Sequence, residues 1–156
     1  MNGRLSTELW RLVLPVLWFG MVAAIGFIEA PLKFQAPGIT IPLGLGIGRL
    51  VFAALNAVEG LLLVALILVS LWPRAARLAR ARLAWLAGLA ALFVVKIALV
   101  RPPLNARTDL VLAGADPGQS PWHYVYIACD LLTLALLVVL AMQAARSIRR
   151  LANGGS

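Results

Sequence analysis

The chain has 156 residues, of which 62% are hydrophobic and 13% are charged, and its formal net charge is +8. Ordinary globular domains are about 45–50% apolar, so this composition excludes a typical soluble domain and indicates an integral membrane protein. The single cysteine, Cys129, excludes an internal disulfide and a cysteine-based metal site within one chain.

Four apolar stretches are long enough to cross a bilayer, which takes about 20 mostly apolar residues for a hydrocarbon core roughly 30 Å thick. They cover about 9–30, 46–71, 83–100 and 122–144. We therefore expect an all-α protein, an integral membrane antiparallel four-helix transmembrane bundle that forms a single domain over 1–156. The first stretch is interpreted as a helix of the mature protein, because it is too long for a signal peptide and three more spans follow.

The connections follow from these spans. Two outer loops are expected at about 31–45 and 101–121, and a cytoplasmic loop at about 72–82. Pro31, followed by Pro37 and Gly38, is predicted to end the first helix, because these residues interrupt regular structure.

Glycines and tryptophans mark the ends of the predicted spans. Gly44, Gly46 and Gly48 match neither the dinucleotide-binding nor the P-loop pattern, so they predict a flexible start of the second span. The tryptophans mostly fall near span ends, where aromatic rings anchor helices at the membrane interface. We therefore predict an anchoring role for Trp10, Trp18, Trp72, Trp85 and Trp122.

The basic residues predict the orientation of the bundle. Nine of the fourteen lie on one side of a four-span chain: Arg4, Arg11, Arg74, Arg77, Arg80, Arg82, Arg146, Arg149 and Arg150. The positive-inside rule then places both termini in the cytoplasm. Anionic lipid head groups attract such arginines, and the chain contains no nucleic-acid-binding module, so we expect the lipid bilayer and no nucleic acid as its partner.

The second span carries a polar stripe. Arg49, Asn56 and Glu59 fall within about 80° of one another on a helix. Glu59 lies roughly 15 Å deeper than Arg49, close to the middle of the membrane. A charge at that depth costs about 2.5–3.5 kcal/mol on insertion scales, so Glu59 is expected to face the bundle interior and a basic partner.

The other three spans repeat this design. In the fourth span, His123, Tyr126 and Asp130 share one face, with Asp130 about 10 Å deeper than His123. The remaining outer-half groups are Lys96 and Arg101 of the third span and Glu29 of the first, with Lys33 one turn after Glu29. The inner halves consist almost uniformly of Leu, Val and Ala. The pattern predicts a polar pocket that opens toward the exterior, with Glu59 and Asp130 as its floor.

We interpret this cluster as a binding site for a small ligand, ion or proton, because ionisable groups inside membranes are most often functional. The predicted ligand-binding residues are Glu29, Arg49, Asn56, Glu59, Lys96, Arg101, His123, Tyr126 and Asp130. In the alternative interpretation, Glu59 with Lys96, and Asp130 with Arg49 or Arg101, only tie helices together.

A metal site is a further alternative. Glu29, Glu59, His123 and Asp130 supply one imidazole and three carboxylates, which is enough for zinc, iron or manganese. However, no pair of them lies on adjacent turns of one helix, and nearby basic residues compete for the carboxylates. We therefore expect no metal, and the pattern assigns no cofactor.

Four segments carry a resemblance: FIEAPLKF, IGRLVFAALNAVE, RPPLNARTD and WHYVYIACD. Here the chain resembles small four-span bacterial inner-membrane proteins of uncharacterised function, and in architecture the resemblance covers most of the chain. It implies a multi-pass location in the bacterial inner membrane. It implies no reaction and no catalytic residue.

Other functions stay open at this point. The apolar inner halves of the second and fourth spans suit a non-catalytic interaction subunit of a larger membrane complex. A membrane oxidoreductase that uses a metal, haem or quinone is another alternative, although the single His123 excludes a haem with two histidine ligands in one chain. Four spans are few for a monomeric transporter, so a transport role implies a homodimer.

Overall fold

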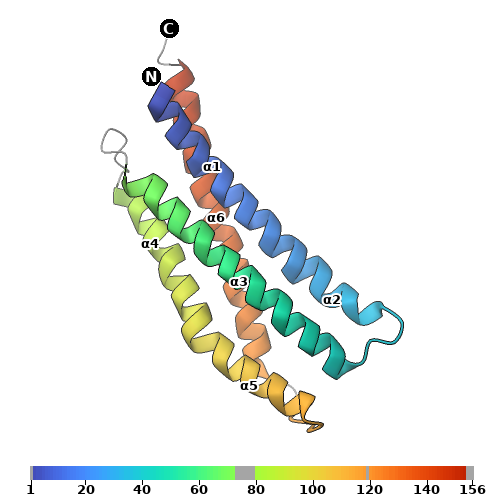
Figure 1. Ribbon diagram of the computed structural model, residues 1–156. Coiled ribbons are helices and arrows are strands. Elements are labelled where there is room, and N and C mark those ends of the chain that lie inside the picture. Colours follow the sequence, from blue (N-terminus) through green and yellow to red (C-terminus); the bar gives the residue numbers. More distant parts are fainter. Residues whose placement is uncertain (1, 73–79, 119, 154–156) are drawn as a thin grey trace.

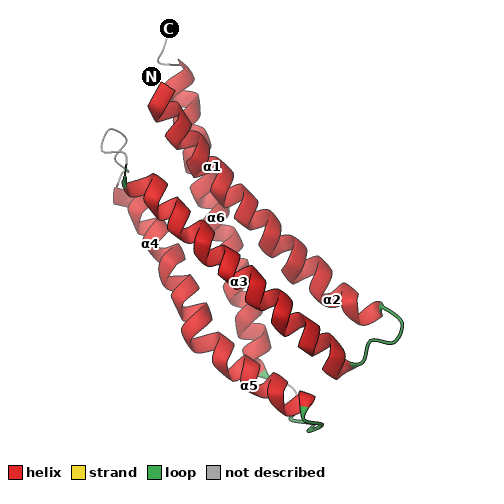
Figure 2. Ribbon diagram, in the orientation of Figure 1, coloured by secondary structure: helices red, strands yellow, loops and turns green. Residues whose placement is uncertain are grey.

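Every element in the described part of the chain is a helix (Figure 2). The computed structural model describes residues 2–72, 80–118 and 120–153. The elements are α1 (Asn2–Ala23), η1 (Ala24–Glu29), α2 (Ala30–Leu32), η2 (Lys33–Gln35), α3 (Ile41–Leu71), α4 (Arg80–Val95), η4 (Lys96–Val100), α5 (Arg101–Leu112) and α6 (Pro121–Asn153). Here η1 and η4 are π-helical and η2 is a 3₁₀ turn.

These elements join into four continuous rods that are long and apolar enough to cross a membrane, which confirms the predicted all-helical architecture. They run over Gly3–Gln35, Ile41–Leu71, Arg80–Leu112 and Pro121–Asn153. A rod of about 33 residues is roughly 50 Å long, so its ends reach beyond a hydrocarbon core about 30 Å thick. A helix suits this setting because it satisfies its backbone hydrogen bonds internally.

Consecutive rods run in opposite directions (Figure 1). Asn2 and Asn153 lie at one end of the bundle, here called the termini end, and residues 36–40 and 113–118 lie at the other, here called the loop end. The first rod packs against α6 and α3, and α4 packs against α6. Of the predicted cytoplasmic loop, residues 73–79, with Arg74 and Arg77, lie outside the described part of the chain.

Each π-helical segment ends two residues before a proline. At its end a backbone N–H bonds to the carbonyl five residues back, from Ala30 to Ile25 and from Arg101 to Lys96. In an α-helix the proline ring clashes with the carbonyl four residues earlier, and the wider π turn relieves that clash. The first rod therefore continues through Pro31 to Gln35, and the third through Pro102 to Leu112. The first helix was predicted to end at about residue 30, and Pro31 does not stop it; it ends at Gln35, just before Pro37 and Gly38, which the prediction also named.

The loop end also contains more helix than the sequence pattern indicates. Residues 41–45 and 101–112, expected in outer loops, are helical. Thr40 caps α3 by accepting a hydrogen bond from the Leu43 N–H at 3.4 Å. At the end of α5, Gly114 adopts φ +86° and the Ala115 N–H bonds to the Leu110 carbonyl at 3.0 Å, which closes the helix in a Schellman motif.

The glycines at the start of the second rod are part of α3, so the predicted flexible segment is a helix. Gly44 and Gly48 are buried, and a Cβ atom at Gly44 would overlap the Phe34 ring. At Gly48, a Cβ atom would lie 2.9 Å from Lys33 Nζ. The missing side chains thus let the end of the first rod approach α3 closely.

The apolar core lies between the four rods toward the termini end. It is formed mainly by leucines of all four rods together with Trp18 and Val22. Trp18 is fully buried and its ring meets Phe93 edge-on, with centroids 6.4 Å apart. The predicted interfacial anchoring role of Trp18 is therefore wrong.

Candidate functional site: a buried charge cluster beside a cationic pocket

Three charged side chains from three rods meet in the interior of the bundle. The Lys96 ammonium at the start of η4 donates to both carboxylate oxygens of Glu59 on α3, each at 2.8 Å. It also donates to Oδ1 of Asp130 on α6 at 3.0 Å. Glu59 and Lys96 are 0% exposed and Asp130 is 3% exposed. The three residues are called the charge cluster below.

The first rod adds a neutral donor to the charge cluster. Trp18 on α1 donates its indole N–H to Glu59 Oε1 at 2.9 Å. The Tyr126 ring lies 5.4 Å from the Lys96 ammonium, within reach of a cation–π contact. An ammonium has three N–H donors, and all three have carboxylate acceptors here. The cluster is therefore a closed network with no spare donor on Lys96.

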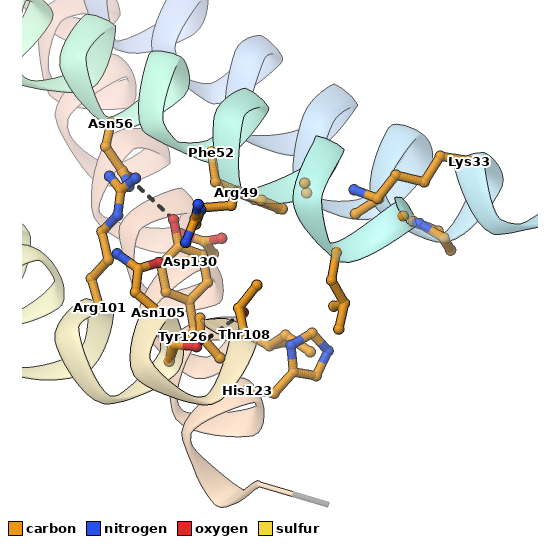
Figure 3. Close-up of a pocket in the computed structure, with 18 of the residues that line it drawn as sticks. Lys33, Arg49, Phe52, Asn56, Arg101, Asn105, Thr108, His123, Tyr126 and Asp130 are labelled. Atoms are coloured by element: carbon orange, nitrogen blue, oxygen red, sulfur yellow. Dashed lines mark hydrogen bonds between the residues drawn. The ribbon is translucent and has the colours of Figure 1, made fainter. Parts of the chain in front are cut away.

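A pocket of about 490 Å³ lies next to the charge cluster on the loop side (Figure 3). Residues of the first rod, α3, α5 and α6 line it, and Asp130 belongs both to its wall and to the charge cluster. Its walls are mostly apolar and include the rings of Phe27, Phe34 and Phe52. Such a volume is typical of small-molecule sites, which measure about 300–1,000 Å³.

Three basic side chains line this pocket: Lys33, Arg49 and Arg101. Lys33 lies 3.4 Å from Glu29, and Arg49 forms an ion pair with the exposed Asp109. Arg101 has no hydrogen bond or ion pair within residues 2–72, 80–118 and 120–153. Figure 3 shows Arg101 on one side of the pocket and Lys33 on the other.

Asn56 brings an unsatisfied polar group to the pocket wall. Its side chain is 4% exposed, and its Oδ1 accepts a hydrogen bond from the Tyr126 hydroxyl at 3.2 Å. Its Nδ2 is buried and has no hydrogen-bond partner in the described part of the chain. An amide rotated by 180° would instead leave the oxygen unpaired. Buried polar atoms normally have a partner, so this one calls for an explanation.

The structure places the predicted site residues in three settings. Arg49, Asn56, Arg101, His123, Tyr126 and Asp130 line the pocket. Glu59 and Lys96 lie behind Asp130 in the charge cluster and do not line the pocket. Glu29 faces Lys33 and is also absent from the lining. The floor expected from Glu59 and Asp130 is thus formed by Asp130 alone. Lys96, and neither Arg49 nor Arg101, is the cation bound to Asp130.

The sequence pattern missed two contributors to this region. Trp18 falls nine residues after the predicted start of the first span, and only its burial shows that it reaches Glu59. Lys33 lies one helical turn after Glu29, and this spacing already placed it among the outer-half groups, but it was not included among the predicted ligand-binding residues.

A second ion cluster, also absent from the prediction, lies at the termini end. Glu8 receives hydrogen bonds from Arg11 at 2.6 Å and from Arg82 at 3.0 and 3.2 Å. Arg11 also donates to the carbonyls of Val69 and Ser70 in the last turn of α3. The inner half is therefore not uniformly apolar. Glu8 and Arg11 of α1 thus bind Arg82 of α4 and two backbone carbonyls of α3, so this cluster joins α1, α3 and α4.

The residues considered as metal ligands do not converge. Within the described residues, no group of three or more His, Cys, Asp and Glu side chains is close enough to hold a metal ion. His123 and Glu29 lie apart from the charge cluster, in which an ammonium occupies the space between the carboxylates. The donor set therefore does not fit the metal alternative.

Comparison of the chain with protein-family models, with curated proteins and with solved structures finds no match. The case for a function therefore rests on the pocket and the charge cluster.

Proposed function

We propose that this chain is a multi-pass protein of the bacterial inner membrane that binds a small molecule in the pocket at its loop end. In this proposal both termini lie in the cytoplasm, and the pocket faces the exterior. The described arginines Arg4, Arg80, Arg82, Arg146 and Arg149 lie toward the termini end and support this orientation through the positive-inside rule.

The observation that carries the proposal is the unpaired Nδ2 of Asn56, buried in the wall of a pocket of about 490 Å³. A buried donor without a partner costs about 1–3 kcal/mol, and a ligand in the pocket would supply that partner. The volume far exceeds the roughly 30 Å³ that one water molecule occupies in the liquid. The site thus has both the space and an unused polar group for an organic ligand.

A small molecule fits this arrangement better than a bare ion or proton. In the charge cluster the Lys96 ammonium lies within 3.0 Å of both carboxylates, so it occupies the position that a metal cation would need between them. The pocket is lined by three basic side chains and by apolar rings, which repel a hydrated cation. The alternative function, an interaction subunit of a larger membrane complex, does not explain why the chain has this pocket.

Filling the pocket tests the proposal. A Cβ atom at Gly26, in the pocket wall, would lie 3.6 Å from Asp130 Oδ2, so Gly26→Leu places its side chain in the pocket. Gly20 on the same rod is exposed with nothing within 4 Å of a Cβ atom, which makes Gly20→Leu the matched control. Gly26→Ala, with only ordinary contacts, tests whether the backbone tolerates a side chain.

The measurement is mass spectrometry of small molecules extracted from the protein in lipid nanodiscs. We expect a compound at about one copy per chain in the wild type, Gly20→Leu and Gly26→Ala, and its loss in folded Gly26→Leu. Identical extracts from wild-type and Gly26→Leu protein would contradict binding in this pocket.

A further inference from the structure

The charges around the pocket indicate the class of its ligand. Lys33, Arg49 and Arg101 line the pocket, whereas Asp130 is the only acidic side chain in its lining. Asp130 shares the Lys96 ammonium with Glu59, so one cation faces two carboxylates and the charge cluster keeps a formal charge of −1 behind the pocket wall. Counted over the lining alone, three cations face one carboxylate.

Two of the three cations are already engaged, and the third is not. The Asp109 partner of Arg49 is 62% exposed, and the Glu29 partner of Lys33 is 34% exposed and 3.4 Å away. Arg101 is half-buried and forms no ion pair in the described part of the chain. A guanidinium binds a carboxylate or phosphate in bidentate fashion, so Arg101 is suited to bind an anionic group of a molecule in the pocket.

Asn56 lies on the same side of the pocket as Arg101 (Figure 3). Its unpaired Nδ2 is a neutral donor that can share an anionic oxygen with the guanidinium. Phe27, Phe34 and Phe52 line the rest of the pocket, and they favour an apolar body over a sugar or an inorganic ion. Phe27 and Phe34 are also partly exposed on the flank of the bundle, so the apolar body can extend toward lipid.

From these observations we infer that the ligand is an amphiphilic organic anion, whose carboxylate or phosphate binds Arg101 and Asn56 while its apolar body contacts the phenylalanine rings. This inference rests on the proposed function, because it names the ligand class of the same pocket. The head group can belong to a free organic acid or to an anionic lipid, and the experiment separates these sources.

The test uses three probes with one apolar body: phenylbutanoate, the neutral phenylbutanol and the cationic phenylbutylamine. Binding to the protein in phosphatidylcholine nanodiscs is measured from the shift in its unfolding temperature. We expect phenylbutanoate to bind most tightly and phenylbutylamine to give no shift.

In Arg101→Gln the affinity for phenylbutanoate should fall about 10- to 100-fold, since a hydrogen-bonded charge is lost. The control Arg107→Gln, on the same helix but outside the pocket lining, should retain it. Arg101→Lys, which keeps the charge, should retain part of it.

A second arm replaces part of the phosphatidylcholine with phosphatidylglycerol. If the ligand is a lipid, phosphatidylglycerol stabilises the wild type and Arg107→Gln but not Arg101→Gln, and added phenylbutanoate has no further effect. If the ligand is a free acid, phosphatidylglycerol changes nothing and phenylbutanoate still stabilises the protein. Either result supports an anionic ligand.

Two results would overturn the inference, and they differ from failure of the proposed function. If phenylbutanol and phenylbutanoate bound equally well, and Gly26→Leu bound neither, the result would support binding in the pocket but contradict an anionic ligand. Absence of stabilisation by all three probes and by phosphatidylglycerol would also reject the anion. Only identical small-molecule extracts from the wild type and Gly26→Leu would reject the pocket itself.

Discussion

Lys96→Met is the substitution to which the bundle should be most sensitive. The methionine side chain is similar in length, but it removes the ammonium that donates three hydrogen bonds to Glu59 and Asp130. Both carboxylates would then lie in the interior without a cation, because Arg49 and Arg101 line the pocket and form no ion pair with either carboxylate.

The expected loss follows from which energetic effect dominates. Hydrogen bonds between membrane helices average about 0.6 kcal/mol, so three of them account for roughly 2 kcal/mol. Removing one partner of a buried ion pair costs about 3–5 kcal/mol, because the remaining charge is left uncompensated. Here two carboxylates lose one shared cation, and each is at most 3% exposed. The desolvation effect therefore dominates, and we expect a loss of about 5 kcal/mol in the free energy of unfolding.

The assay is reversible unfolding in mixed micelles with increasing dodecyl sulfate, followed by tryptophan fluorescence. Lys33→Met is the matched control, because its ion pair of 3.4 Å has a partly exposed acid and should contribute at most about 1 kcal/mol. Combining Lys96→Met with Glu59→Gln and Asp130→Asn removes all three charges and should restore most of the stability. Equal losses in Lys96→Met and Lys33→Met would refute the reasoning, since they would mean that water reaches the cluster.

Two further substitutions test contacts that the structure adds to the sequence pattern. Trp18→Phe keeps an aromatic ring but removes the hydrogen bond to Glu59, so it should lower the free energy of unfolding by about 1.5–3 kcal/mol, whereas Trp10→Phe on the exposed face should leave it unchanged. A similar loss in both, measured by the same unfolding assay, would contradict the role of the indole N–H. Glu8→Gln removes the buried carboxylate that binds Arg11 and Arg82 at the termini end, so it should destabilise the protein by about 3–5 kcal/mol. Glu29→Gln is the control, because the Glu29 carboxylate is partly exposed, and it should change the free energy of unfolding by less than about 1 kcal/mol. If thermal unfolding showed a larger loss in Glu29→Gln than in Glu8→Gln, the stabilising role of the Glu8 ion pairs would be refuted.

The periodicity of the sequence was sufficient to predict polar stripes on α3 and α6. Arg49, Asn56 and Glu59 follow one stripe of α3, and Tyr126 and Asp130 follow one stripe of α6. A charge in a long apolar segment must turn away from lipid, so these stripes had to face the bundle interior. The cation of Glu59 is Lys96, the partner named in the helix-tying alternative.

The ends of the helices were predicted less well, because local rules compete there. Pro31 and Pro102 normally interrupt a helix, and the sequence carries no signal that a π turn will absorb their rings. The position of Lys33 in the pocket depends on that continuation.

What the sequence determined by itself was the set of four apolar rods and the face of each rod that must avoid lipid, because both follow from hydrophobicity and helical periodicity along one segment. The pairing of Asp130 with Lys96, the hydrogen bond from Trp18 to Glu59 and the unpaired Asn56 amide were decided only by the tertiary structure. These contacts depend on how each rod is rotated and shifted against its neighbours. That arrangement results from side-chain packing between residues far apart in the chain, which no single segment encodes.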